Sequence, residues 1–450
     1  MSISIIKSKY LLFRSAIILP FIYMTPAHAN DVSISYSVNG NPLAVSASAD
    51  RFAGAIVSLT FRGVQYVDIY DHGREIQSAI QLDNLGECYN PNEAGSETDG
   101  TGQTTTSILH LISNTNNVLQ TQTQPAFWLP KNYNYNKPCN PNLPYPDNII
   151  STAQNTNDLS NYTIARTTSF FGPSIPNLLN VQTSFTVPEN HNSSNAEALT
   201  AYLPSSFSTF LQYDRASRTL IKVAAGGVDT PSQHTPRPVI IAQPNGAHAM
   251  GVISPAIIAN PSVGYIAYIK YGGQAATSKW SCVFGETNII AGSTYTYSCP
   301  LAVGNVDEVV DAFNAYPVPG QTITTMIPIY RFYGYQKHFM TPSYAEGAST
   351  GYVFETTGFH LFPAADSGLK ALYRCNNAIY NDHFVSTQSN CEGFTQEGIY
   401  GYASISEYPG SYPLYRFYRG TTRDHLITIN YSEGASGGYL YEGILGYVTS

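Results

Sequence analysis

The chain has 450 residues with 22 Lys and Arg against 30 Asp and Glu, which gives a formal net charge of -8 at pH 7. Charged residues make up only 12% of it, so the chain lacks the basic face that binding to a nucleic-acid backbone requires. The composition argues against nucleic acid as a partner.

The first 29 residues are typical of a secretory signal peptide. Lys7, Lys9 and Arg14 make a basic start, residues 16–23 form a short apolar run, and Ala27-His28-Ala29 has the small-x-small pattern that precedes a cleavage point. The apolar run is shorter than the roughly 20 residues needed to span a bilayer, and no later stretch is long enough. We therefore predict cleavage after Ala29, no membrane insertion, and a secreted, periplasmic or cell-surface location.

Residues 30–316 alternate apolar and polar side chains in short runs. Examples are residues 55–61 and 239–242, and Gly, Pro and Asn separate such runs. This pattern predicts an all-β domain built as a large antiparallel β-sandwich. One helix is predicted over residues 306–313, before a linker at 317–327. Residues 88–105 and 131–160 are expected to be long loops, which are often functional.

The six cysteines all follow the predicted signal peptide, and an even number in an exported protein favours disulfides. Six cysteines allow several pairings, and proximity in sequence favours Cys88–Cys139, Cys282–Cys299 and Cys375–Cys391. None of them has the Cys-x-x-Cys spacing of a zinc site. We predict no metal and no cofactor.

The C-terminal part contains an internal repeat. Tyr-Arg-Phe-Tyr at 330–333 returns as Tyr-Arg-Cys at 373–375 and as Tyr-Arg-Phe-Tyr at 415–418. Each copy continues with a short His-containing block and a closing block that ends in Glu. One unit of this size cannot bury its own apolar face, whereas three can close around a shared core. We expect a compact pseudo-threefold module at 328–450, with repeats at about 328–369, 370–411 and 412–450.

These repeated blocks resemble a repeat module that is common in exported bacterial proteins. The resemblance covers residues 328–450, with two departures: repeat one has Lys337 where the module has Asp, and repeat two has Phe394 where its closing block has Tyr. No function is assigned to that module, and sugar binding is the function suspected for it. The resemblance implies a glycan-binding module.

Residues 52–67 resemble the opening hairpin of galactose-mutarotase-like domains, in which a Gly-x-Ile-x-Ser-Leu strand leads to a turn glycine and a second strand. Asp71-His72-Gly73-Arg74 stands where that superfamily brings a Gly-Arg to its sugar cleft. The superfamily's His-x-Tyr-Phe-Asn-Leu catalytic segment is not recognisable in this sequence. The resemblance implies a mutarotase-like sandwich with a carbohydrate cleft.

The densest polar cluster of the chain spans residues 71–93. A mutarotase-like reaction needs a carboxylate to take a hydroxyl proton and an imidazolium to protonate the ring oxygen. We nominate Glu87 and His72 for these catalytic roles, with Arg74 and Glu75 binding the substrate. The alternative is that Asp71 and Arg74 form a structural ion pair and that His72 caps a strand.

Two further residues are candidates for substrate binding, each with a structural alternative. Trp128 is either a platform for stacking a sugar or a buried core residue, and His248 is either a ligand-binding or a satisfied core histidine. Cleavage of a glycosidic bond needs two carboxylates at a set separation. Glutamates between 75 and 97 are available for this chemistry.

The repeat module places three kinds of side chain at matched positions. They either line three sugar pockets or form repeated structural bridges between Arg and Glu. They are Arg331, Arg374 and Arg416; His338, His383 and His425; and Glu355, Glu397 and Glu442.

Two functions follow as hypotheses. In the first, the chain is an exported carbohydrate-binding or carbohydrate-active protein whose partner is a carbohydrate or cell-surface glycan. If it is an enzyme, the chemistry is sugar epimerisation, or glycoside cleavage or elimination. In the second, it is a non-catalytic surface-adhesion protein in which the sandwich is a scaffold. Whether the chain is an enzyme stays open at this stage.

Overall fold

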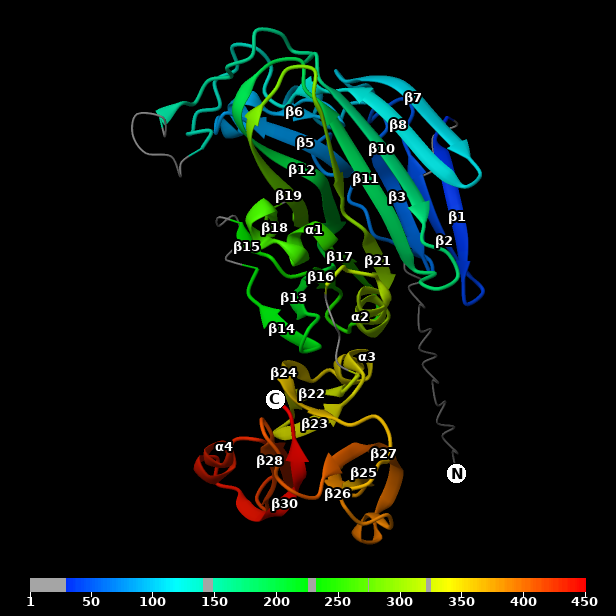
Figure 1. Cartoon of the computed structure of the whole chain (residues 1–450), viewed down its shortest axis with the longest axis vertical. Coiled ribbons are helices and arrows are strands. Elements are labelled where there is room, and N and C mark those ends of the chain that lie inside the picture. Colours follow the sequence, from blue (N-terminus) through cyan, green and yellow to red (C-terminus); the bar gives the residue numbers. More distant parts are fainter. Residues whose placement is uncertain (1–29, 141–148, 226–231, 274, 321–324) are drawn as a thin grey trace, which may run out of the picture.

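A computed structural model of the chain describes residues 30–140, 149–225, 232–273, 275–320 and 325–450. The predicted signal peptide lies outside the described residues, as do residues 321–324 of the predicted linker. The described chain is all-β, as predicted, with a large N-terminal body stacked on a smaller C-terminal module (Figure 1). Within the described ranges, no helix is long and apolar enough to cross a membrane.

The first sheet of the N-terminal body is antiparallel and 11-stranded. Three short strands branch from its main path: β4 (Val64–Gln65), β6 (Pro91–Asn92) and β9 (Ala126–Phe127). Along the main path the order is β1 (Val32–Val38), β2 (Asn41–Ala47), β3 (Ile56–Phe61), β5 (Ile76–Leu82), β12 (His191–Pro204), β19 (Thr277–Ile289), β18 (Gly264–Tyr271) and β15 (Gln233–Thr235).

The second sheet is antiparallel and 10-stranded, and β20 (Thr294–Ser298) joins it by pairing with β11. Its main path runs through β14 (Thr219–Val223), β13 (Thr209–Asp214), β16 (Val239–Ala242), β17 (Ala249–Val252), β21 (Leu301–Gly304), β11 (Leu178–Thr186), β10 (Thr163–Phe170), β8 (Val118–Gln124) and β7 (Ile108–Thr115).

The two sheets form a sandwich because their inward side chains share one hydrophobic core. Leu59 and Trp280 of the first sheet and Phe185 of the second belong to the same buried cluster. The disulfide Cys282–Cys299 joins β19 to the residue after β20, so it links the two sheets covalently. Cys88–Cys139 and Cys375–Cys391 are also formed, so all six cysteines pair as the sequence predicts.

One ion pair is buried inside the sandwich. Nη1 of Arg166 on β10 lies 2.6 Å from Oε2 of Glu93, and both side chains are at most 1% exposed. The other end of the guanidinium donates to the carbonyl of Gly54 at 2.6 Å, and the carboxylate also accepts from the amide of Ser78 at 2.9 Å. The pair connects the second sheet to the segment that follows β6 of the first.

Short helices complete the sandwich at its edges and turns. They are η1 (Gly86–Tyr89), η2 (Glu97–Asp99), α1 (Pro255–Ala259), η4 (Pro261–Val263) and α2 (Val306–Ala315). Helix α2 begins where predicted and ends two residues later than predicted. Its start is fixed by a capping box, in which Asn305 accepts from the amide of Glu308 and the Glu308 carboxylate accepts from the amide of Asn305.

The C-terminal module consists of three similar units, each with three antiparallel strands and one helical turn. The units are β22 (Ile327–Gly334), β23 (Lys337–Thr341), α3 (Tyr344–Ser349) and β24 (Val353–Leu361); β25 (Leu369–Asn377), β26 (Asp382–Ser386), η5 (Cys391–Gly393) and β27 (Thr395–Ser404); and β28 (Tyr412–Arg419), β29 (Asp424–Thr428), α4 (Tyr431–Ser436) and β30 (Leu440–Val448). The matched residues Ile329, Leu372 and Leu414 meet in one buried cluster. The units therefore close around a shared core.

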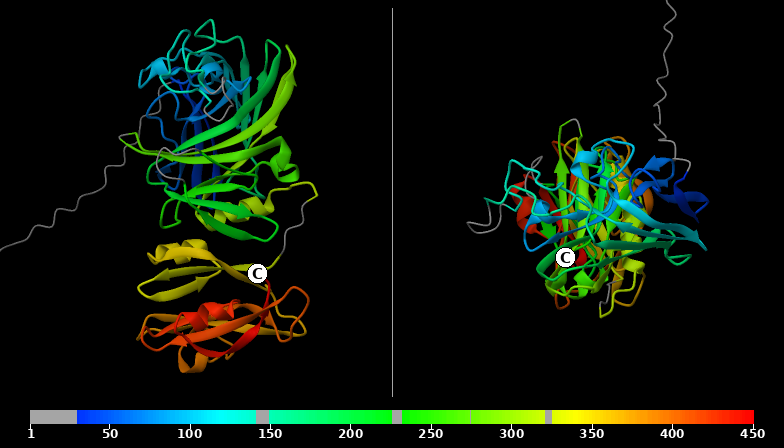
Figure 2. Two further views of the ribbon diagram at one scale, coloured as in Figure 1. Left: turned by 90° about the vertical axis from the view of Figure 1, so that its left-hand side faces the viewer. Right: turned by 90° about the horizontal axis from the view of Figure 1, so that it is seen from above.

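The first unit of the module packs against the sandwich, and Figure 2 shows the two parts as adjoining layers. Tyr330, Phe332 and Phe354 are buried in one cluster with residues of β13, β16 and α2. Asp307 at the start of α2 accepts from the Ser343 hydroxyl and from the Tyr344 amide, both at 2.7 Å. Apolar burial and a capping carboxylate therefore hold the two parts together.

Candidate active site

A cavity lies on the outer face of the first sheet. Trp280 and Cys282 of β19 point into the core. The residues that alternate with them, Lys279, Ser281 and Val283, therefore point outward, and all three line the cavity. Outward residues of β5, β12 and β18 continue this floor, among them Gln77, Glu197, Tyr265 and Tyr271.

The cavity has two lobes. The acid lobe, of about 180 Å³, is lined by Gly73, Trp128, Tyr135 and Tyr202 among others, and the open lobe, of about 420 Å³, by Asn195, His234 and Tyr265 among others. Glu87, Glu197, Tyr271 and Lys279 line both lobes and mark the junction between them.

The roof of the cavity comes from the two loops that the sequence predicts to be functional. Glu87 lies on η1, one residue before the predicted loop at 88–105, and Tyr135 lies in the predicted loop at 131–160. The disulfide Cys88–Cys139 ties the two loops together. Gly86 has φ +55° and lies so close to the carbonyl of Cys139 that a side chain at this position would collide with the backbone. The disulfide and this close approach hold Glu87 over the sheet.

Glu87 is the acidic group of the roof. Its Oε2 accepts a hydrogen bond from Nδ2 of Asn90 at 2.8 Å, and its Oε1 accepts from Nε2 of Gln81 at 3.4 Å. Burial raises the pKa of Glu87 above its ordinary value, and the nearby charge of Glu197 raises it further against the opposing effect of the Asn90 bond. Glu87 is therefore suited to donate a proton, whereas the sequence-based hypothesis gave it the proton-accepting role.

Glu197 on the floor of the cavity has a pKa that is shifted in the opposite direction. Burial alone would raise its pKa, but Lys279 at 3.1 Å and hydrogen bonds from the hydroxyls of Thr200 at 2.5 Å and Ser281 at 3.0 Å outweigh burial and lower it. Burial alone would lower the pKa of Lys279. The negative charge of Glu197 outweighs the effect of burial, so the pKa of Lys279 rises well above its ordinary value. The floor therefore holds a carboxylate and an ammonium ion, both charged.

Aromatic rings border both lobes. Trp128 lies over Gly73 in the acid lobe, and the rings of Tyr202 and Tyr271 stack with centroids 6.4 Å apart. In the open lobe, the rings of His234 and Tyr265 stack at 4.1 Å. Flat aromatic faces beside hydroxyl, amide and carboxyl groups suit the alternating apolar and polar surface of a sugar.

The structure assembles only part of the predicted site. Glu87 and Trp128 line the cavity, whereas His72, Arg74, Glu75 and His248 are not among its lining residues. The predicted trio of Glu87, His72 and Arg74 is therefore not formed.

The side chains of His72 and Arg74 make structural contacts with neighbouring loops. His72 is buried, and its two ring nitrogens contact the carbonyl oxygens of Gly100 at 2.7 Å and Arg51 at 2.9 Å. Arg74 pairs with Asp71 at 3.3 Å and also donates to the carbonyl of Ala275. The structural alternative therefore describes Arg74, and a catalytic role for His72 has no support.

Glu75 and His248 do not line the cavity either. Glu75 is fully buried, and burial raises its pKa well above the ordinary value. Nδ1 of His248 lies 3.0 Å from the hydroxyl of Tyr66. Neither side chain supports the substrate-binding role predicted for it.

Sequence reasoning missed Glu197, Lys279 and the tyrosines at positions 202, 265 and 271. The available signal was a charged residue beside apolar ones: Glu197 stands between Ala196 and Ala198, and Lys279 precedes Trp280.

The arginines of the repeat module form a closed cycle of ion pairs. Nε of Arg331, Arg374 and Arg416 binds the closing glutamate of the same repeat at 2.8, 2.8 and 2.9 Å. Nη1 of each binds a glutamate of the preceding repeat, and the first repeat takes its partner from the third. The closing glutamates are Glu355, Glu397 and Glu442, and the partners from the preceding repeat are Glu433, Glu346 and Glu392, in the same order. The structural-bridge interpretation therefore describes these arginines.

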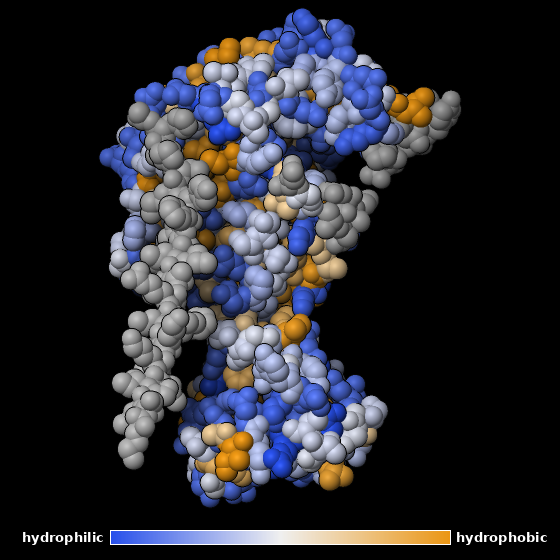
Figure 3. Space-filling view, turned by 180° about the vertical axis from the view of Figure 1, so that it is seen from behind, coloured by the Kyte–Doolittle hydropathy of each residue, from blue (hydrophilic) through white to orange (hydrophobic). Residues whose placement is uncertain are grey.

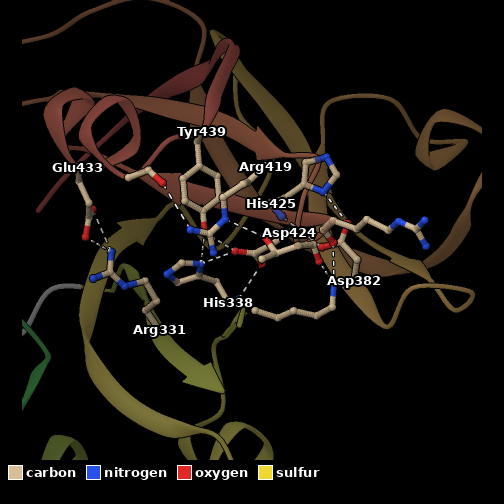
Figure 4. Close-up of polar contacts among 12 residues, drawn as sticks. Arg331, His338, Asp382, Arg419, Asp424, His425, Glu433 and Tyr439 are labelled. Atoms are coloured by element: carbon tan, nitrogen blue, oxygen red, sulfur yellow. Dashed lines mark hydrogen bonds and ion pairs between the residues drawn. The ribbon is translucent and has the colours of Figure 1, made fainter. Parts of the chain in front are cut away.

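The histidines of the module form a second, incomplete cycle (Figure 4). Nδ1 of His338 lies 2.8 Å from Asp424, and Nδ1 of His425 lies 2.7 Å from Asp382. The third carboxylate is missing because the matched position holds Lys337, so His383 instead lies 3.4 Å from Glu397. Each histidine has its own carboxylate, and the described part of the chain contains no group of three or more His, Cys, Asp or Glu that could hold a metal ion.

We expect Arg416→Ala to destabilise the module without removing a ligand site. Arg416 is 14% exposed and loses two carboxylate partners, so its cost should fall between about 1 kcal/mol for an exposed pair and about 3–5 kcal/mol for a buried one. Thermal unfolding of the full chain measures this loss. An unchanged melting temperature with weaker glycan binding would instead assign the arginines to sugar pockets.

Comparison with known proteins gives a partial assignment. Residues 328–449 match the family model described as a domain of unknown function, DUF5648. No curated protein matches the chain.

Solved structures that resemble the chain include several carbohydrate-active proteins. The heparan sulfate lyase HepC from Pedobacter heparinus has 9% identity and a TM-score of 0.33 over 62% of this chain and 36% of the lyase. A galactose mutarotase related enzyme from Lactobacillus acidophilus has 7% identity and a TM-score of 0.31 over 65% of this chain and 100% of that one. The GH36 alpha-galactosidase AgaA from Geobacillus stearothermophilus, solved with stachyose, has 8% identity and a TM-score of 0.33 over 63% and 42%. The chain thus spans about a third of the lyase it matches.

Proposed function

We propose that this chain is an exported, carbohydrate-active protein whose sandwich performs acid–base chemistry on a sugar in the two-lobed cavity. The observation that carries this proposal is the pair of carboxyl groups at the lobe junction, whose pKa values are displaced in opposite directions. Such a pair separates an acid from a base within one site. Export is supported by the three disulfides, which form and persist in oxidising compartments.

The roles of the groups follow from their environments. Glu87 holds a proton that it donates to the oxygen that leaves the anomeric carbon, and Glu197 accepts the proton of the hydroxyl or water that attacks it. The ammonium group of Lys279, 3.1 Å from Oε2 of Glu197, keeps this carboxylate ionised. Trp128 and Tyr202 provide flat faces for the sugar ring.

The test of this proposal is turnover and binding of chosen sugars by the full chain. Suitable probes are D-galactose for interconversion of anomers, stachyose for glycoside cleavage and heparan sulfate for elimination. We expect turnover of at least one of these, with Trp128→Ala raising its KM by about two- to tenfold, since an aromatic contact contributes about 0.5–1.5 kcal/mol. Tyr412→Ala, an exposed tyrosine of the module, is the matched control and should change nothing.

Non-catalytic adhesion is the second candidate function, and exposed apolar side chains on the module favour it. Tyr431 is 47% exposed, Leu440 72% and Tyr441 46%, and Figure 3 shows apolar patches on the surface of the module. Binding of whole cells or polysaccharide that Leu440→Asp abolishes and Trp128→Ala leaves intact, without turnover of any probe, would establish adhesion instead.

A further inference from the structure

We infer that the cavity takes a neutral oligosaccharide across its two lobes, and that Tyr265 and His234 form the platform for the sugar in the open lobe. This inference rests on the proposed function and adds to it the charge and the length of the substrate. It follows from three features of the cavity: its charge, the position of its junction, and the ring pair of the open lobe.

The charge of the cavity does not suit an anionic sugar. Among the described residues that line the two lobes, Lys279 is the one lysine or arginine, and Glu197 at 3.1 Å already neutralises it. Arg74, close to the rim residue Gly73, is engaged by Asp71 at 3.3 Å. Lys137, 4.3 Å over the Tyr135 ring, is not among the lining residues, so a sulfate or uronate group inside the cavity would lose its hydration without contacting an unpaired cation, which is costly. Hydroxyl groups, in contrast, find amide and hydroxyl partners in both lobes.

The position of the junction favours a substrate of more than one sugar. Glu87 and Glu197 line both lobes, so they lie where the lobes meet and not at the end of either. A single sugar beside them fills one lobe and leaves the other empty. An oligosaccharide that crosses the junction instead places a glycosidic bond next to Glu87, with one sugar against Trp128 and the next toward Tyr265.

The open lobe contains a preformed ring surface for that second sugar. The His234 and Tyr265 rings stack at 4.1 Å with planes only 22° apart, which fixes the tyrosine ring. His234 is exposed and Tyr265 is half-buried, so the pair lies at the mouth of the lobe and not in the core. His234 and Tyr265 are not among the predicted site residues, and neither takes part in the proton transfers proposed for Glu87 and Glu197.

Cleavage across the junction balances with water as the second reactant. The proton of Glu87 passes to the glycosidic oxygen as the bond between that oxygen and the anomeric carbon breaks. Water forms the new bond to the anomeric carbon, and its proton passes to Glu197. No oxidant or reductant is required.

The experiment measures binding and cleavage of neutral ladders from monosaccharide to hexasaccharide in the gluco-, manno- and galacto-series by the full chain, with heparan sulfate fragments as the anionic comparison. We expect Tyr265→Ala to raise KM or Kd by up to about tenfold for disaccharides and longer chains, and to leave the value for the monosaccharide unchanged. Tyr265→Phe, which keeps the ring, should behave as the wild type.

Three outcomes would overturn the inference. One is an equal loss for every chain length with Tyr265→Ala, and another is no loss at any length. The third is stronger binding of the anionic fragments than of every neutral ladder. Failure of the proposed chemistry is distinguishable, because full turnover by Glu87→Gln would contradict the acid role while leaving the chain-length dependence intact.

Discussion

We expect Arg166→Ala to lower the free energy of unfolding of the chain by about 3–5 kcal/mol, because it leaves the buried carboxylate of Glu93 without its partner. Arg166 and Glu93 are at most 1% exposed, and their contact at 2.6 Å is supported by the Gly54 carbonyl and the Ser78 amide. Urea unfolding followed by circular dichroism gives the free energy directly.

The loss in free energy of unfolding caused by Arg166→Ala should depend on pH. Burial raises the pKa of Glu93, and Arg166 opposes that rise in the wild type. Without Arg166 the folded-state pKa of Glu93 climbs further above its unfolded value. A raised folded pKa contributes stability below the unfolded pKa that is lost as pH rises through the folded one, so the deficit should be larger at neutral than at acid pH.

The matched control for Arg166→Ala is Arg237→Ala. Arg237 lies 3.4 Å from Asp214 with its side chain 44% exposed, so its removal should cost at most about 1 kcal/mol. Similar losses for Arg166→Ala and Arg237→Ala would show that the buried pair is not a main support of the sandwich.

Replacing Glu87 by glutamine should give the largest loss of activity. The amide keeps the shape and the Asn90 contact but has no acidic proton, so kcat should fall by about 10²–10⁴-fold, the range typical of a lost general acid. KM should stay within about twofold because the ring contacts of Trp128 and Tyr202 remain.

The pH profile of the wild type provides an independent check of this role. Activity should disappear as pH rises through the raised pKa of Glu87, and as it falls through the lowered pKa of Glu197. In Glu87→Gln the alkaline limb should be lost while the acid limb stays. Glu286→Gln, on β19 beyond the cavity lining, is the control and should keep both limbs.

Local patterns in the sequence predicted the elements and contacts whose partners lie close in the chain. The strands, the three disulfides and the bridges between Arg331 and Glu355 and their counterparts follow from alternation, proximity and repetition. The second glutamate of each bridge was missed, although the repeats share a Glu-Gly at 346–347, 392–393 and 433–434.

The cavity could be predicted only in part because its groups meet through tertiary structure. Glu197 and Lys279 come from different strands, and the register between β12 and β19 shifts at a bulge between Glu197 and Leu199. A bulge changes which face a side chain takes, and alternation in the sequence does not reveal it. His72 has a catalytic type of side chain in a polar cluster, but its backbone partners at Gly100 and Arg51 depend on loop geometry that the sequence does not show.

The closed cycle of ion pairs also has a consequence for biosynthesis. Arg331 in the first repeat needs Glu433 from the third, and the amide of His360 donates to the carbonyl of Thr449 at 2.9 Å. Chains fold from the N-terminal end as they are made, but this module cannot complete its first repeat until its last strand has emerged. The module should therefore stay unfolded during most of its synthesis and acquire protease resistance in one step, after its last residues have left the ribosome.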